Sequence, residues 1–314
     1  MKTLIIGASG KIGKYLVKYK RKDYIYTYNK KKIKHGIKFN LSKDNIETIL
    51  KNFSVTKVVL LAAISDPDEC FKNKKKSKLI NITKTKKIID ILVKQNIYFI
   101  FFSSEFIFCG KKSNYNETSN VTPNNLYGKQ KYFIEKYIKK KTKNFAILRV
   151  SKTYGDDLND KTLITNFLND LKRRKRNFKI ASDQRFNPLY IMDLEKIISL
   201  FLKKRIKGIF NVGGPEQLSR YQCFKKMKNQ FSAEKRKKIY LEKTNLKNFK
   251  LIEKRPLDVT FNISKIKNVI NFRLQKIEEV TVSMNVIKPS MVENKATTNM
   301  ETAVNQTPGV LIVD

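Results

Sequence analysis

The chain has 314 residues, which is enough to bury a substantial core in one large α/β domain or two smaller ones. It contains only three cysteines, Cys70, Cys109 and Cys223, without metal-ligand spacing, and its single histidine, His35, lies in a lysine-rich stretch. We therefore expect no disulfide framework, zinc site or histidine-based catalytic triad. The cysteine usage suits a reducing cytoplasm.

The formal net charge is +40, and most of the excess is lysine. Lysine clusters can neutralise nucleic-acid phosphates, but here they are spread along the chain rather than gathered in one tail. We favour solvated lysine faces with a general attraction to anionic small molecules over a dedicated nucleic-acid site. No stretch approaches the roughly 18 to 20 apolar residues of a membrane span, so we expect a soluble, cytoplasmic protein.

The first predicted strand, at 2–6, is followed directly by the glycine-rich sequence "GASGKIG". The spacing of Gly7, Gly10 and Gly13 suits a sharp turn, a close approach to a pyrophosphate and tight packing of the next helix. That helix would direct its free N–H groups and partial positive charge at the diphosphate of a dinucleotide. A flexible turn without a ligand can have the same pattern, so the rest of the chain has to decide.

Predicted strands and helices alternate over the first 150 residues. We expect helices at 11–20, about 76–95 and about 125–141, between further strands at 24–28, 57–63, 97–104 and 145–150. This alternation is typical of βαβ units and predicts an α/β fold with a parallel sheet. Ligands of such sheets bind beyond the carboxyl ends of the strands. Small or hydroxyl-bearing residues fall there and favour a bound dinucleotide, namely Gly7, Ala62, Ala63, Ser103 and Ser104.

Tyr127 and Lys131 stand four residues apart in "NNLYGKQKYFIEKYI", so on a helix both side chains project from one face. A nearby ammonium stabilises a phenolate, and we expect it to lower the pKa of Tyr127 from its ordinary value of about 10. The lysine could also hold the ribose of a nicotinamide cofactor. A Tyr-x-x-x-Lys match arises easily by chance in this chain, but its place after "SSEFIF" and downstream of the glycine loop makes it more specific.

The order of the motifs carries a resemblance to a known family. In chain order they are "GASGKIG", "LLAAISDPDEC", "FFSSEFIFCGKK", "YNETSNVTPNNLYGKQK", "ILRVSKTYG", "NPLYIMDL", "GIFNVGGPEQLSRY" and "RPLDVTFNISK". The chain resembles the extended short-chain dehydrogenase/reductases, and among them it is most similar to the dTDP-4-dehydrorhamnose reductase family of sugar-nucleotide reductases. The resemblance covers about residues 1–280.

This resemblance implies a Rossmann doubly wound parallel sheet at 1–150, with a returning segment near 187–212. It also implies a smaller substrate-binding domain made mainly of 151–282. The implied activity is NAD(P)H-dependent reduction of a keto-sugar within a nucleotide-diphosphate sugar, and a homodimer is one option for the assembly.

Carried over by position, the resemblance implies that Tyr127 is the general acid and Lys131 its electrostatic partner and ribose ligand. Ser104 would hydrogen-bond the reacting carbonyl; the family often has Thr there, and Ser keeps the donor. The cofactor would deliver hydride to a ketone carbon while Tyr127 protonates the developing alkoxide.

The residues implied to contact the substrate depart in part from the family pattern. Glu105 stands where the family often has Asp. Lys152, in "RVSKTYG", stands where rhamnose-forming members usually have an aromatic residue that packs on the sugar, so the sugar's identity is open. We interpret Arg149 as a buried structural arginine. Because a guanidinium can pair with phosphate oxygens in two places, three other arginines are candidates for binding the nucleotide diphosphate: Arg185, Arg220 and Arg255.

The choice of cofactor depends on the residues after the second strand, where an acidic side chain would bind the adenosine ribose and repel a 2′-phosphate. Here Asn29 and Lys30 favour NADP(H), and NAD(H) stays an option. Asn40 and Leu41 match the family's adenine-side position, which is usually Asp-Leu. The full set expected to bind the cofactor is Gly7, Ser9, Gly10, Lys11, Ile12, Gly13, Asn29, Lys30, Asn40, Leu41, Ala62, Ala63, Ser103, Tyr127 and Lys131.

Two other functions remain open from the sequence. One is a non-catalytic NADP-binding regulatory subunit of the same fold, as in the methionine adenosyltransferase β subunit; the presence of Ser104, Tyr127 and Lys131 favours the enzyme. The other is a sugar-nucleotide epimerase or dehydratase, an option that Glu105 keeps open.

The composition changes character near the C-terminus. From 281 onward the sequence carries two lysines against three acidic residues and is rich in Thr and Asn. We expect 283–314 to form an extended or partly disordered tail. Its last apolar run, 310–313, could instead add a strand to a sheet edge of this chain or of a partner.

Overall fold

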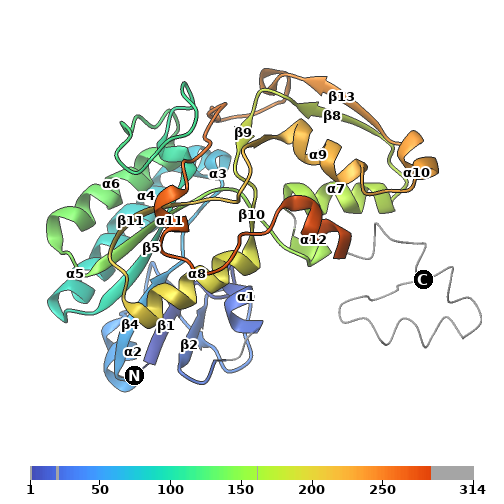
Figure 1. The fold of residues 1–314 in the computed structure, drawn as a ribbon. Coiled ribbons are helices and arrows are strands. Elements are labelled where there is room, and N and C mark those ends of the chain that lie inside the picture. The colour runs from blue at the N-terminus through green and yellow to red at the C-terminus, as the bar shows by residue number, and fades with distance from the viewer. Residues whose placement is uncertain (1, 19–20, 161, 284–314) are drawn as a thin grey trace, which may run out of the picture.

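The structure, a computed structural model, describes residues 2–18, 21–160 and 162–283. A seven-stranded sheet, parallel throughout, forms its centre (Figure 1). In spatial order its strands are β11 (Gly208–Val212), β6 (Phe145–Val150), β5 (Tyr98–Ser104), β4 (Val55–Leu60), β1 (Lys2–Ile6), β2 (Tyr24–Tyr28) and β3 (Ile37–Lys38). The predicted doubly wound α/β fold is confirmed.

Helices cover both faces of the sheet. Successive residues of β1 alternate between two cores, with Leu4 and Ile6 in one and Ile5 in the other, as the period of a strand requires. The first core is closed by α2 (Glu47–Asn52), α5 (Thr85–Lys94) and α6 (Leu126–Lys141). The second is closed by α1 (Gly13–Lys18) and α8 (Ile191–Lys204).

The helix expected at about 76–95 is divided into three parts. A π-helical segment, η1 (Leu79–Lys84), separates α4 (Lys74–Lys78) from α5. The wider turn holds the buried Asn81, whose amide accepts from the backbone N–H of Ile64 and donates to its carbonyl, each at 2.9 Å. A regular helix is therefore interrupted where Asn81 binds the loop that follows β4.

A second group of elements lies beside the sheet (Figure 1). Its main unit is the parallel pair β8 (Asn177–Ala181) and β13 (Tyr240–Thr244), packed against α9 (Arg220–Lys228). Three short elements pack on the sheet domain, namely α3 (Pro67–Lys72), η2 (Glu105–Ile107) and α11 (Ser264–Lys267). The further elements that the structure describes are β7 (Thr153–Tyr154), η3 (Leu158–Asp160), α7 (Leu163–Lys172), β9 (Arg185–Phe186), β10 (Leu189–Tyr190), β12 (Leu218–Ser219), α10 (Ala233–Lys237), η4 (Leu246–Asn248) and α12 (Ile277–Ser283).

Residues 284–314 lie outside the described part of the chain, so the expected tail at 283–314 stays a prediction. Among the helices that the structure describes, none combines the length and the apolar character needed to cross a membrane.

Arg149 on β6 forms a buried ion pair with Glu135 on α6, with a shortest distance of 2.8 Å between Nη2 and Oε2. Its Nε donates to the same carboxylate, and its Nη1 donates to the carbonyl of Glu117 at 3.1 Å. The guanidinium is thus well supplied with acceptors, and Arg149 does not line the cavity described below. This geometry agrees with the structural interpretation of Arg149.

Replacing Glu135 by Leu should therefore lower the free energy of unfolding by about 3–5 kcal/mol, because it leaves the Arg149 charge buried without its carboxylate. Urea unfolding of Glu135→Leu and of the double variant Glu135→Leu/Arg149→Met measures the effect. The double variant should be more stable than the single one, since it leaves no unpaired charge. A single variant as stable as the parent protein would contradict the prediction.

Candidate active site

A cavity of about 640 Å³ opens at the carboxyl ends of β1, β4, β5 and β6. Its wall is completed by the first residues of α7 and α9 and by Arg255, which belong to the second group of elements. The predicted site residues that line it are Gly7, Gly10, Lys11, Ile12, Gly13, Ala63, Ser103, Ser104, Glu105, Tyr127, Lys131, Lys152 and Arg220. Most of the predicted site is thus brought to one place.

The glycine loop is packed too tightly for side chains at two of its three glycines. Gly7 has a φ of +89°, and a Cβ there would lie 2.8 Å from the Cα of Ala62. A Cβ at Gly13 would lie 2.5 Å from the Cα of Ala8. At Gly10 the nearest contact would be the carbonyl oxygen of Gly7 at 3.3 Å, so the loop's backbone is accessible from the cavity there.

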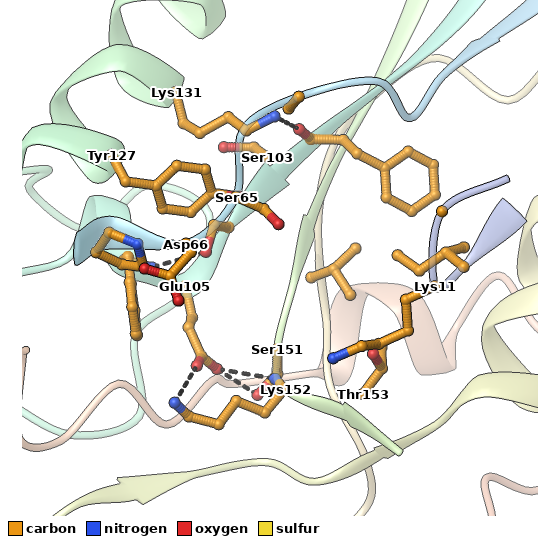
Figure 2. A pocket seen from close by; sticks show the side chains of 18 of the residues that line it. Lys11, Ser65, Asp66, Ser103, Glu105, Tyr127, Lys131, Ser151, Lys152 and Thr153 are labelled. Carbon is orange, nitrogen blue, oxygen red and sulfur yellow. Dashed lines mark hydrogen bonds and ion pairs between the residues drawn. The ribbon is translucent and has the colours of Figure 1, made fainter. Parts of the chain in front are cut away.

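Tyr127 and Lys131 lie across the cavity from Lys11 of the glycine loop (Figure 2), and Ser104 lines the same cavity and hydrogen-bonds with Tyr127. Ser104 ends β5, while Tyr127 and Lys131 project from the first turns of α6, which begins after the N-cap Asn125. The Lys131 ammonium is buried and donates to the carbonyl of Phe102 at 2.7 Å. It lies 5.7 Å from the centre of the Tyr127 ring.

The pKa of Tyr127 is raised, not lowered as the sequence led us to expect. Burial of the phenol is the main cause, the nearby Cys70 adds to it, and a hydrogen bond with Ser104 opposes it. Burial also lowers the pKa of Lys131 to about 8. The expectation was wrong because both groups lose water together, which disfavours the phenolate and the ammonium alike. At neutral pH the phenol keeps its proton.

The far end of the cavity holds a buried carboxylate between cations. Glu105 accepts from the Ser151 hydroxyl and, at 3.3 Å, from the backbone N–H of Lys152. The Lys152 ammonium lies 4.0 Å from Glu105 Oε1. Burial raises the pKa of Glu105 and lowers that of Lys152 to about 8. Arg220 is partly buried nearby, and the loss of water lowers its pKa as well.

Arg255 was among the arginines expected to bind the diphosphate, whereas several other residues that line the cavity were not expected. Arg255 is held at the cavity by an ion pair with Asp68 on α3, with 2.9 Å between Nη1 and Oδ1. The "SDPDEC" motif could have indicated the loop after β4; no local signal marked the start of α7. The newly found polar lining residues are Ser65, Asp66, Ser151, Thr153 and Thr162.

Some predicted residues do not line the cavity. Arg185 is half-exposed and pairs with Asp258, its Nε lying 3.5 Å from Oδ2. The Asn40 side chain accepts from Ser42 within a local turn, and Leu41 is buried in the core. The others outside the lining are Ser9, the exposed Asn29 and Lys30, and Ala62, which packs behind Gly7.

The residues present fit a dinucleotide. Among the described residues, the buried hydroxyl of Ser103 has no hydrogen-bond partner, although it faces the cavity. Lys131 uses one of its three N–H donors on Phe102 and can offer others to a ribose. Gly7–Gly13 can hold the diphosphate, because its backbone is exposed to the cavity at the start of α1.

Fold and cavity together define a Rossmann-type protein of the extended short-chain dehydrogenase/reductase class. The family model for the RmlD substrate binding domain matches residues 1–287, and the chain belongs to this family. It is also 22% identical over 241 residues to methionine adenosyltransferase 2 subunit beta of Xenopus laevis, a match that covers 74% of this chain and 72% of that protein.

Solved structures of similar fold include a hypothetical dTDP-4-dehydrorhamnose reductase from Sulfolobus tokodaii. It has 25% identity and a TM-score of 0.77, covering 88% of this chain and 98% of that one. The dTDP-4-dehydrorhamnose reductase of Bacillus anthracis, solved in complex with NADP, has 20% identity and a TM-score of 0.76, covering 92% of this chain and all of that one.

The lowered pKa of Lys131 predicts a pH dependence of stability. The unfolded chain keeps this proton up to about its ordinary value of 10.5, whereas the folded protein releases it near pH 8. The free energy of unfolding should therefore rise from pH 8 to 10.5, by up to ~1.4 kcal/mol per pH unit from this residue. Urea unfolding of the cofactor-free parent and of Lys131→Met should give a smaller slope for the variant; equal slopes would contradict the assignment.

Proposed function

We propose that this protein is a reductase that transfers hydride from a bound nicotinamide cofactor to a keto group of a nucleotide-linked sugar. The observation that carries this proposal is that Ser104, Tyr127 and Lys131 line the same cavity as the glycine loop Gly7–Gly13. Membership of the RmlD substrate binding domain family supports the same class of reaction.

We further propose that different parts of the chain bind the cofactor and the substrate. Residues 1–150, with the returning segment near 187–212, hold the cofactor, while 151–282 mainly bind the substrate. The pairing of β11 with β6 supports the first part, because it makes a late segment of the chain an edge of the sheet.

In this mechanism the substrate carbonyl lies between Ser104 and Tyr127. When bound, the reduced nicotinamide supplies the hydride that the carbonyl carbon accepts. Ser104 donates a hydrogen bond to the oxygen, and Tyr127 donates its phenolic proton to the developing alkoxide. The raised pKa of Tyr127 supports the role of acid, since the proton is present before the reaction. Lys131 stabilises the resulting phenolate until it regains a proton from solvent.

NADP(H) is the favoured cofactor, with NAD(H) as the alternative. Lys30 follows β2, and Thr27 on that strand accepts a hydrogen bond from the N–H of Gly7 at 3.1 Å. The segment after β2 therefore starts beside the glycine loop, where a 2′-phosphate on the adenosine ribose would meet an exposed cation rather than a carboxylate.

The similarity to methionine adenosyltransferase 2 subunit beta supports a second candidate, a non-catalytic NADP-binding subunit that regulates a partner. Incubation with NADPH and a panel of nucleotide 4-keto-sugars discriminates between the functions. Net NADPH consumption with a reduced sugar product supports the reductase. Product formation without net consumption identifies an epimerase or dehydratase, and cofactor binding without any turnover favours the regulatory subunit.

Tyr127→Phe should lower turnover by about 10²- to 10⁴-fold and leave NADPH binding nearly intact, because it removes the proton donor and keeps the ring. The matched control is Tyr132→Phe, on the same helix but outside the cavity lining. Stopped-flow NADPH oxidation and cofactor titration measure the two effects. Turnover of Tyr127→Phe at the parent rate would show that Tyr127 is not the acid.

NADPH should bind more tightly than NADH, and Lys30→Asp should weaken or reverse that preference, because it replaces a cation by a charge that repels the 2′-phosphate. Lys94→Asp, on an exposed position at the end of α5, makes the same change in net charge and should leave the preference unchanged. Fluorescence titration of both cofactors against all three proteins gives the answer. Equal affinities for NADPH and NADH in the parent would contradict the prediction.

A further inference from the structure

The far end of the cavity carries more cations than carboxylates, and the cations are not fully buried, with the Lys152 side chain 25% exposed. The charged residues are four cations, Lys11, Lys152, Arg220 and Arg255, and three carboxylates, Glu105, Asp66 and Asp68. Arg255 is paired with Asp68, which leaves Glu105 as the carboxylate nearest to both Lys152 and Arg220. Because a partly buried cation is stabilised by a partner of opposite charge, the unmatched positive charge at this end favours an anion from outside the chain.

The donors at this end are incompletely used. Within the part of the chain that the structure describes, the Lys152 ammonium makes no hydrogen bond, and its single ion pair with Glu105 is long at 4.0 Å. The Nε of Arg220 also has no hydrogen-bond partner among the described residues. Glu105, by contrast, is already held by Ser151 and by the backbone of Lys152. Lys152 is therefore not needed to hold Glu105 in place and is free to bind a ligand.

Lys152 lies close to the proposed reacting groups. Its ammonium is 5.0 Å from the centre of the Phe106 ring, and that ring packs edge-on against the Tyr127 ring with 6.4 Å between centres. Figure 2 shows Lys152, Glu105 and Tyr127 bordering the same space. The sugar must occupy this space if its carbonyl is to reach Tyr127. The anion facing Lys152 is then carried by the sugar rather than by the diphosphate.

We propose that the sugar of the nucleotide-linked substrate bears a carboxylate, and that Lys152 with Arg220 recognises it. This inference rests on the proposed function. Lys152 here is a specificity-determining residue: it binds a part of the substrate that takes no part in hydride transfer. Glu105 positions Lys152, and a neutral sugar would leave the positive charge of Lys152 and Arg220 without an added anion.

The test is isothermal titration calorimetry of the NADP⁺-loaded protein with three probes: the nucleoside diphosphate, its glucose conjugate and its glucuronic acid conjugate, in the uridine and thymidine series. The glucuronic acid conjugate should bind at least about tenfold more tightly than the glucose conjugate, because a charge-assisted hydrogen bond contributes binding free energy of this size. Lys152→Met should remove this preference and leave the other two probes within about twofold. Lys152→Arg should keep it, and so should Lys139→Met, an exposed control on α6.

Glucose and glucuronic acid conjugates that bind the parent equally would overturn the inference and leave the reductase proposal intact. A Lys152→Met variant that loses affinity for all three probes alike would overturn it too, because Lys152 would then bind the diphosphate. Failure of every probe to bind would contradict the nucleotide-sugar proposal itself, and this inference with it. NADPH oxidation with keto-sugars tests hydride transfer separately.

Discussion

All seven strands of the central sheet run in the same direction, and the location of the cavity depends on this constraint. Parallel strands place all their carboxyl ends at one edge, so the loops after β1, β4, β5 and β6 open into the same space. Residues separated by more than a hundred positions along the chain thereby become neighbours. The glycine loop on one strand and Ser104 on another line the same cavity without any local sequence signal that relates them.

The buried charges of this protein fall into two kinds that differ in how fully they are partnered. Arg149 and Glu135 form a closed pair, with the guanidinium supplied by a carboxylate and a carbonyl, and they lie outside the cavity. Lys131 is buried and Lys152 and Arg220 are partly buried, and all three line the cavity with donors unused. A buried donor without a partner destabilises the folded state, and its position shows where a ligand can supply what the chain does not.

The π-helical segment connects two walls of the cavity. Asn81 holds the loop after β4 through Ile64 and donates to the side chain of Gln130 on α6 at 2.7 Å. Gln130 in turn donates to Ser77 on α4 at 2.9 Å. Since α6 also carries Tyr127 and Lys131, the position of the proposed acid relative to the loop depends on a buried amide network. A network of this kind stabilises the structure only while every member keeps its hydrogen-bond partner.

Short-range periodicity and spacing were enough to predict the alternation of strands and helices, the glycine loop and the Tyr127–Lys131 pair. The sequence also indicated that Arg149 is structural, and the order of motifs indicated the family. The strand expected at 57–63 lies at Val55–Leu60, a shift within the range that apolar runs leave undetermined.

The folded arrangement was needed to show which of the expected residues line the cavity and which way their pKa values shift. The pKa of Tyr127 rises because burial, which depends on the packing of distant segments, outweighs the nearby charge that the local spacing predicts. Arg255 reaches the cavity through Asp68, nearly two hundred positions earlier in the chain, whereas Arg185 lies outside the lining. The unpaired donors of Lys152 and Arg220 could not be foreseen either, since desolvation and long-range pairing are properties of the folded arrangement and leave no pattern in the local sequence.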